Sequence, residues 1–297
     1  MLLNKPIPLP YILNKIKYNL VYILLLSFAV LYTTDHFQAL LPEMPLTIPT
    51  FIGTAISILL SFKLNQSYDR WWEARKIWGA IVNDSRSLVL QLQALSVEGN
   101  EQAIRKIAYR QIAWCYALGQ SLRGLDPIAA AATFLDEAEI QDIQPQPNKA
   151  LALLQKNALA IRSLRQKNQI DALAHTQLDN TLQRLCDAQG KSERIKSTVF
   201  PVTYRLFLQA TIYLFVITLS IALKDLAPLF EIPLLLIISS AFFLLEKSAT
   251  YMQDPFENRA TDTAVSSIAR TIEINIKQLL KEKDIPNPMP TESFYVL

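Results

Sequence analysis

The sequence predicts an all-α membrane protein with four transmembrane helices and a helical domain outside the membrane. Hydrophobic residues make up 51% of the 297 residues and charged residues 19%, a balance that suits neither an ordinary soluble protein nor a bundle wholly inside a bilayer. Sixteen prolines and only six glycines favour long helices that end at prolines over tight turns. Four apolar segments, paired on either side of a polar middle region, provide the candidate spans.

The four apolar segments form two predicted hairpins, at residues 18–32, 46–62, 204–223 and 232–245. The first and last are short for a hydrocarbon core of roughly 30 Å, which needs about 20 helical residues. We therefore expect residues 226–228 to complete the last span through a broken helix. The alternative is that these apolar segments are buried helices of a soluble protein. The N-terminus is basic before its apolar run but lacks a small-residue cleavage pattern, so we expect it to be retained.

Lys and Arg are unevenly distributed between the connections. The connection 35–45 has none and 224–231 has only Lys224, whereas the termini and the middle region are basic. The positive-inside rule therefore places both termini and the middle region in the cytoplasm. The predicted parts are a cytoplasmic N-terminal segment (1–17), a first hairpin (18–62), a cytoplasmic helical domain (63–200), a second hairpin (201–246) and a cytoplasmic C-terminal segment with a helix (247–297).

The middle region changes to the periodicity of amphipathic helices. A proline- and glutamine-rich loop at 141–148 precedes two predicted helices at 151–166 and 170–188, the second ended by Gly190 as a C-cap. Cys115 and Cys186 fall here and are expected to be free thiols with packing roles. The net charge of +3 is spread out without a basic stripe, so nucleic acid is not an expected partner.

The second apolar segment continues into a charged helix without a break. Residues 57–78 contain neither Gly nor Pro, so we expect one helix to leave the bilayer and enter the cytoplasmic domain. Thr54, Ile58 and Phe62 recur at intervals of four and share one face. In a symmetric oligomer this face would line a pore whose apolar collar gates by dewetting. The alternative is that these side chains face lipid or the next helix.

The residues that follow this face are charged and aromatic. Lys63, Gln66 and Arg70 continue a neighbouring polar face into the cytoplasm, and Asp69 with Arg70 is expected to be a buried structural ion pair rather than a binding site. The remaining residues of note are tryptophans suited to a belt at the membrane interface, Trp71, Trp72 and Trp78.

No constellation of catalytic residues is present in the sequence. The only two histidines, His36 and His175, are predicted on opposite sides of the membrane, so a histidine-based metal site or a Cys–His pair is not supported. Six glycines leave hardly any material for a phosphate-binding loop. We therefore predict that the protein is not an enzyme and has no cofactor.

Three motifs resemble the bestrophin family of ion channels, and its bacterial branch in particular. They are NQSYDRWWEARKIWG at 65–79, DPFENRATDT at 254–263 with TIEINIKQLL at 271–280, and a weaker match at 201–204. The resemblance implies a homopentamer in the inner membrane, with lipid around it, one axial pore and a wider cytoplasmic vestibule. Its neck positions fall on Thr54, Ile58 and Phe62, although Thr54 replaces the usual bulky apolar residue.

The resemblance also implies two sites outside the neck. A second constriction lies in the helix at 170–188, where Ile170, Leu173 or His175 would face the axis. Eukaryotic members hold calcium with an acidic cluster after the Pro-Phe-Gly segment. Here 257–262 has two carboxylates and an inserted Arg259, too few ligands for a cation that takes six to eight oxygens, so we expect no calcium clasp.

These observations predict a pentameric channel that passes small monovalent ions, chloride among them, passively through a hydrophobic neck. The alternatives are a non-conducting membrane scaffold or sensor, and a secondary transporter, which would need inverted repeats and interrupted helices. Selectivity for anions or cations stays open. Lys63 and Arg70 near the neck favour anions, whereas Asp69 and Glu73 offset them.

Overall fold

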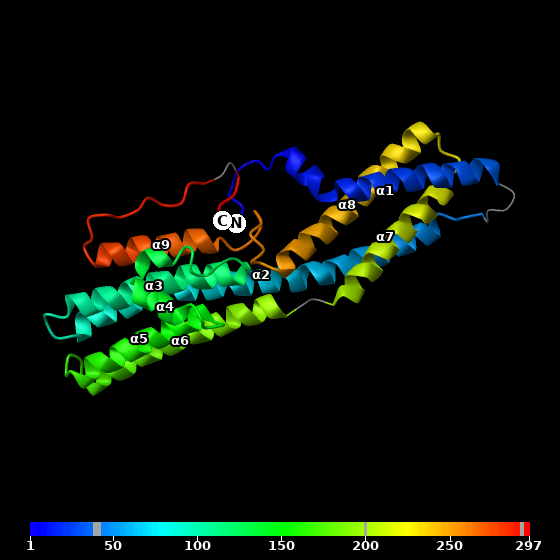
Figure 1. Ribbon diagram of the computed structural model, residues 1–297. Helices are drawn as coiled ribbons and strands as arrows, with labels where there is room; N and C mark the ends of the chain where they lie inside the picture. The colour runs from blue at the N-terminus through cyan, green and yellow to red at the C-terminus, as the bar shows by residue number, and fades with distance from the viewer. Residues whose placement is uncertain (38–42, 199–200, 292–293) are drawn as a thin grey trace. The chain divides into compact units, whose positions relative to one another are not determined.

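The structure, a computed structural model, describes residues 1–37, 43–198, 201–291 and 294–297, and its regular elements are helices (Figure 1). Part of the predicted connection 35–45 lies outside the described residues. The chain divides into two compact units. The membrane unit comprises Lys5–Arg70 and Val199–Gln253, and the polar unit comprises Met1–Asn4, Trp71–Thr198 and Asp254–Leu297.

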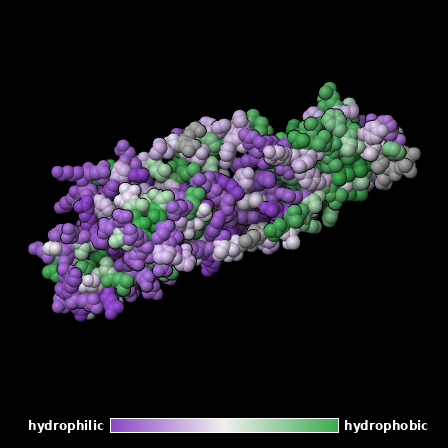
Figure 2. Space-filling model, in the orientation of Figure 1, coloured by the Kyte–Doolittle hydropathy of each residue, from purple (hydrophilic) through white to green (hydrophobic). Residues whose placement is uncertain are grey.

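Four helices among the described residues are long and apolar enough to cross a membrane: α1 (Leu9–His36), α2 (Thr47–Leu95), α7 (Val202–Ala222) and α8 (Pro228–Gln253). Hydrophobic residues gather over the membrane-unit helices in Figure 2. The prediction of a broken last span is wrong. Helix α8 runs for 26 residues through Pro233 without interruption. A proline inside a helix lacks the N–H for one backbone hydrogen bond, yet α8 continues on both sides of Pro233.

The membrane unit is held together by a core that joins all four spans. Its buried members are Ile16, Ile23, Ile56, Leu60, Leu208, Ile212, Phe215, Val216 and Phe243. Gly53 lets α2 approach α7 closely, because a Cβ built there would lie 3.1 Å from the Phe215 ring. Helix α2 is therefore fixed by one side to the other spans, while its remaining surface is exposed.

The polar unit surrounds the second half of α2, which is one helix of 49 residues as predicted. The other helices of this unit are α3 (Glu101–Leu122), η2 (Ala132–Phe134), α4 (Glu137–Ile143), α5 (Lys149–Gln166), α6 (Ala172–Ser197) and α9 (Val265–Leu279). Trp78 is completely buried in the core of this unit with Trp114 and Phe256, so its assignment to a membrane-interface belt is wrong.

Two predicted boundaries in the polar unit are also wrong. Helix α4 takes up the first residues of the expected loop 141–148, and α6 continues through Gly190 to Ser197. A glycine inside a helix costs about 1 kcal/mol, which tertiary contacts can outweigh. Next to Gly190, the buried Gln189 side chain accepts a hydrogen bond of 3.0 Å from Trp114 Nε1 and donates one of 2.8 Å to Glu193.

Candidate functional site

The exposed face of α2 in the membrane unit differs chemically from the exposed face of α8. Between residues 47 and 66 it presents hydroxyl and amide side chains: Thr47, Thr50, Thr54, Ser57, Ser61, Asn65 and Gln66. The corresponding exposed side chains of α8, all apolar, are Pro228, Leu229, Phe230, Pro233, Leu234, Ile237, Ala241 and Leu245. An apolar outward face is what lipid requires, so the α2 face is suited to a different environment.

The three predicted neck residues lie on this exposed face. Ile58 is 54% exposed and Phe62 is 62% exposed. Thr54, one turn before Ile58, is exposed as well. The Thr54 hydroxyl donates to the Thr50 carbonyl oxygen at 2.9 Å, and the Ser57 hydroxyl to the Gly53 carbonyl oxygen at 2.8 Å. The face therefore combines bulky apolar side chains with hydroxyls that are already hydrogen-bonded within the helix.

Lys63 does not lie on this face, contrary to its predicted place on a polar face near the neck. Its side chain is fully buried, and its ammonium donates to Glu246 Oε1 at 2.8 Å and to Thr250 Oγ1 at 2.9 Å. Successive helix positions are about 100° apart, so the residue after Phe62 points toward α8. Its positive charge is neutralised by Glu246, a partner 183 positions away that no local pattern in the chain singles out.

The predicted buried ion pair of Asp69 with Arg70 is wrong. Asp69 is exposed, and within the described part of the chain it forms no ion pair with Arg70. Arg70 is half-buried, and its Nε donates to the Gln253 carbonyl oxygen at 2.8 Å. Adjacent residues on a helix diverge by about 100°, which separates the two side chains. Asp69 follows Phe62 by two turns and shares its exposed face.

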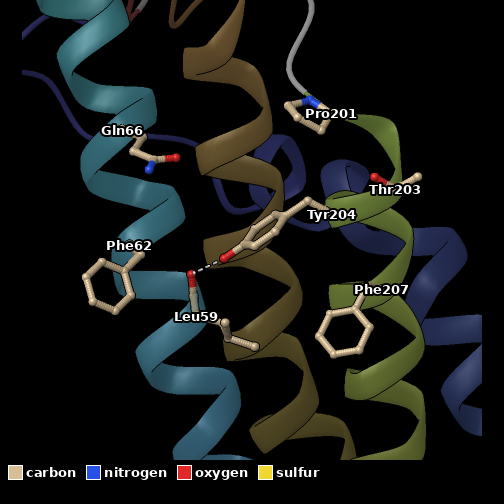
Figure 3. Close-up of a pocket in the computed structure, with 7 residues that line it drawn as sticks. All are labelled: Leu59, Phe62, Gln66, Pro201, Thr203, Tyr204 and Phe207. Carbon is tan, nitrogen blue, oxygen red and sulfur yellow. Dashed lines mark hydrogen bonds between the residues drawn. The ribbon is translucent and has the colours of Figure 1, made fainter.

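A groove lies between α2 and α7 beside the neck positions (Figure 3). Its volume is about 760 Å³, and it is lined by Leu59, Phe62, Gln66, Pro201, Thr203, Tyr204 and Phe207. The Tyr204 hydroxyl reaches from α7 and donates to the Leu59 carbonyl oxygen at 2.9 Å, as the dashed line in Figure 3 marks. This bond ties the two walls of the groove together, so its shape is set within one chain.

The loop at 254–263 holds a compact ion cluster in the polar unit. The Lys196 ammonium donates to Asp254 Oδ2 and to Glu257 Oε1, each at 2.7 Å. The pKa of Glu257 is lowered to about 2 by a hydrogen bond with Asp254 and by Lys196, whereas burial raises the pKa of Asp254. Burial also raises the pKa of Asp262 to about 6, despite a 3.0 Å bond from the Arg259 amide.

The three candidates for a second constriction occupy different environments at the start of α6. Ile170 is 2% exposed and belongs to the core of the polar unit, which turns it away from any solvent-filled passage. His175 is half-buried, and Leu173 is 69% exposed. Only Leu173 and His175 therefore remain able to face an open passage.

The comparisons with known proteins bear on what this site does. Residues 7–278 match the bacterial and fungal bestrophin protein family, which is most of the chain. The chain belongs to that family. A bacterial bestrophin homolog from Klebsiella pneumoniae has a crystal structure that superposes with a TM-score of 0.85 at 28% identity, covering 91% of this chain and all of that chain. The bestrophin fold is thus shared over nearly the whole length.

Curated bestrophin relatives carry names that describe transport. A voltage-dependent anion channel-forming protein of Mesorhizobium japonicum is 32% identical over 248 residues, which cover 82% of this chain and 78% of that protein. One from Escherichia coli K12 is 29% identical over 292 residues, covering 96% and 93%. These relatives are named as channels and not as enzymes. Together with the four apolar helices, they support a multi-pass membrane protein of the channel class.

Proposed function

We propose that this bestrophin is a homopentameric channel that passes small monovalent ions passively through one axial pore. The exposed face of α2 lines the pore, with Thr54, Ile58 and Phe62 at the neck. The observation that carries the proposal is the hydroxyl-rich outward face of α2, which contrasts with the apolar exposed face of α8. The family membership and the names of the relatives agree with it.

The neck works as an apolar collar in this proposal. Around a symmetry axis, one Ile58 and one Phe62 per subunit form two stacked rings without charge or free hydrogen-bonding groups. Water leaves such a constriction readily, and ions lose their hydration there, so its width and wetting set the conductance. Thr54 at the outer end gives a ring of smaller side chains, and the constriction is narrowest at the two inner positions.

The charges near the neck bear on ion selectivity, and the names of the relatives describe anion channels. Of the two cations expected to attract anions, Lys63 is buried against Glu246, and Arg70 points toward Gln253. The nearest ionisable side chain on the exposed face is Asp69. An Asp69 ring at the inner end of the neck opposes anion entry, and the apolar collar then has to carry any anion preference.

The remaining expectations extend this proposal. Leu173 is the best candidate for a second constriction, because it is the most exposed of the three residues considered. The distribution of Lys and Arg supports an inner-membrane protein with both termini and the polar unit in the cytoplasm. A transporter is disfavoured because each of the four spans in the described residues is an uninterrupted helix.

The test is to replace Ile58 and Phe62 together by Ala and to record single-channel currents in planar bilayers. Removal of the collar should raise conductance, with the oligomer unchanged on size-exclusion chromatography. A matched control replaces Val21 and Leu25, which are equally exposed on α1, by Ala and should leave the current unchanged. Wild-type current in the neck variant, with the oligomer intact, contradicts the pore assignment. A protein that never conducts supports the scaffold alternative.

A further inference from the structure

Helices α1 and α8 lie side by side in the membrane unit (Figure 1), and the surface between them forms a second groove. Its volume is about 560 Å³, and it is lined by Leu20, Val21, Leu24, Leu236, Ile237, Ser240, Ala241 and Leu244. The Ser240 hydroxyl, the one hydroxyl in this lining, donates to the Leu236 carbonyl oxygen of its own helix. The lining therefore offers no polar side-chain atom without a hydrogen-bond partner, which is what an acyl chain requires.

The α1–α8 groove is similar in length to one leaflet of a bilayer. On α8 its lining runs from Leu236 to Leu244, a separation of eight positions that corresponds to about 12 Å along the helix. One leaflet contributes about 15 Å to a hydrocarbon core of roughly 30 Å. An acyl chain of a single leaflet can therefore lie along the groove for most of its length.

Two lysines lie at one end of the α1–α8 groove. Lys17 precedes the first lining residue of α1 by three positions, and Lys247 follows the last lining residue of α8 by three positions. Residues three apart share a helix face, so each wall of the groove continues into a lysine one turn further on. The two helices remain in contact beyond this point, because the Lys15 ammonium lies 5.0 Å from the centre of the Tyr251 ring. Tyr18 and Tyr251 beside these lysines are of the residue type enriched at headgroup level.

The positive charges at this end of the groove lack a carboxylate partner. Within the described residues, neither Lys17 nor Lys247 forms an ion pair. Helix α1 has no acidic residue before Asp35, and Glu246, which adjoins Lys247 in the chain, is buried against Lys63. Two like charges at the end of an apolar groove, without a counter-ion from the protein, are suited to an anion that enters together with an apolar chain.

We infer that the α1–α8 groove and the two lysines together bind an anionic phospholipid. One acyl chain lies along the groove, and the headgroup phosphate accepts hydrogen bonds from the ammonium groups of Lys17 and Lys247. A lipid with net negative charge is favoured, because two cations repel the positive group of a zwitterionic headgroup. The site lies on other helices than the proposed pore lining and does not depend on it. The proposed orientation places the site in the inner leaflet.

Native mass spectrometry of the detergent-purified protein tests the headgroup contact, with phosphatidylglycerol as the probe and phosphatidylcholine for comparison. Phosphatidylglycerol should bind more tightly to the wild type. Lys17→Gln combined with Lys247→Gln should weaken its binding about thirtyfold, since a lysine near an anionic lipid contributes a gain of about fivefold. Phosphatidylcholine binding should stay unchanged in this variant. Lys17→Arg combined with Lys247→Arg keeps both charges and should keep the binding of phosphatidylglycerol.

A charge control separates this site from general attraction between a basic protein and an anionic lipid. Lys5→Gln combined with Lys224→Gln removes the same charge elsewhere on the membrane unit and should leave the affinity for phosphatidylglycerol unchanged. An equal loss of affinity in this control overturns the inference. A loss of less than about threefold in the variant with Gln at positions 17 and 247 overturns it as well.

The acyl-chain contact is tested without changing the lysines. Ala241→Trp fills the groove and should weaken phosphatidylglycerol binding about tenfold, the loss expected when about two methylene groups leave an apolar contact. Leu245→Trp, on the exposed surface of α8 outside the groove, should leave binding unchanged, and equal affinities of these two variants overturn the inference. Displacement of the lipid by inorganic phosphate would assign the lysines to a soluble anion. A protein that binds no phospholipid would leave the groove to a neighbouring copy, and either result overturns the inference.

Discussion

The buried ion pair of Lys63 and Glu246 should be a major determinant of stability in the membrane unit. Both side chains are completely buried, and the ammonium nitrogen lies 2.8 Å from the carboxylate oxygen. At that separation, an effective dielectric constant of about 20 gives an attraction of about 6 kcal/mol, which offsets the desolvation of both charges. Removing one partner leaves the other charge buried, at a cost of roughly 3–5 kcal/mol.

The perturbation is Lys63→Met or Glu246→Gln, measured as the melting temperature of the detergent-solubilised oligomer. A loss of roughly 3–5 kcal/mol corresponds to a decrease on the order of 10 °C for a domain of this size. Replacing both residues by Met removes both charges and should recover most of the loss.

A matched control lies further along the same helix. Lys76 and Glu73 form an exposed ion pair of 2.7 Å, with side chains 56% and 41% exposed. Such pairs contribute about 0.5 kcal/mol, so Lys76→Met should change melting by little. If the two single variants of the buried pair melt within about 2 °C of the wild type, the charges are hydrated and the reasoning is refuted.

Three further predictions concern the polar unit and the inner end of the neck. Calcium or a chelator should not change the melting temperature, because the Lys196 ammonium already pairs with Asp254 and its neighbouring carboxylate; a calcium-dependent shift in the wild type would show a cation site. The pKa of Asp262 is about 6 in the folded chain against an ordinary value of 3.8, so the folded state binds an extra proton between those values. As pH falls below about 6 this group therefore adds stability, which reaches roughly 3 kcal/mol below pH 3.8, and the contribution is lost again as pH rises through about 6. The melting temperatures at about pH 7 and about pH 5 should differ less in Asp262→Asn than in the wild type. An equal difference in the two proteins would contradict the role of Asp262. Asp69→Asn should shift the reversal potential in a tenfold KCl gradient toward the chloride equilibrium potential; an unchanged value would place Asp69 off the ion path.

The spans and the exposed face of α2 could be predicted because they depend on local properties. Apolar length identifies a span, and spacing of four residues places Thr54, Ile58 and Phe62 together. The same local argument, applied fully, would have excluded a pair between Asp69 and Arg70, since neighbouring helix positions diverge. The exposed hydroxyl residues Thr50, Thr54, Ser57 and Ser61 also follow a helical spacing of four, three and four, so they too could be predicted from the sequence.

Features that depend on distant partners could not be predicted. The burial of Lys63 requires Glu246 on another helix, and pairwise contacts of this kind leave no periodic signal in one sequence. Gly190 has the residue type of a helix end, yet Gln189 beside it is held by Trp114 from α3. Local propensity predicted the wrong end of α6 because contacts in the core outweigh it.

The hydroxyls on the exposed face of α2 have a consequence for how such a passage closes. Thr50, Thr54 and Ser57 each donate to the carbonyl oxygen of the residue four positions earlier in the chain, at 2.7, 2.9 and 2.8 Å. Because these donors are satisfied by the backbone, water can leave the lining without breaking a protein hydrogen bond. In the proposed pore, filling with water and emptying then need no rearrangement of the side chains at these three positions. The presence or absence of water alone can distinguish the open pore from the closed pore.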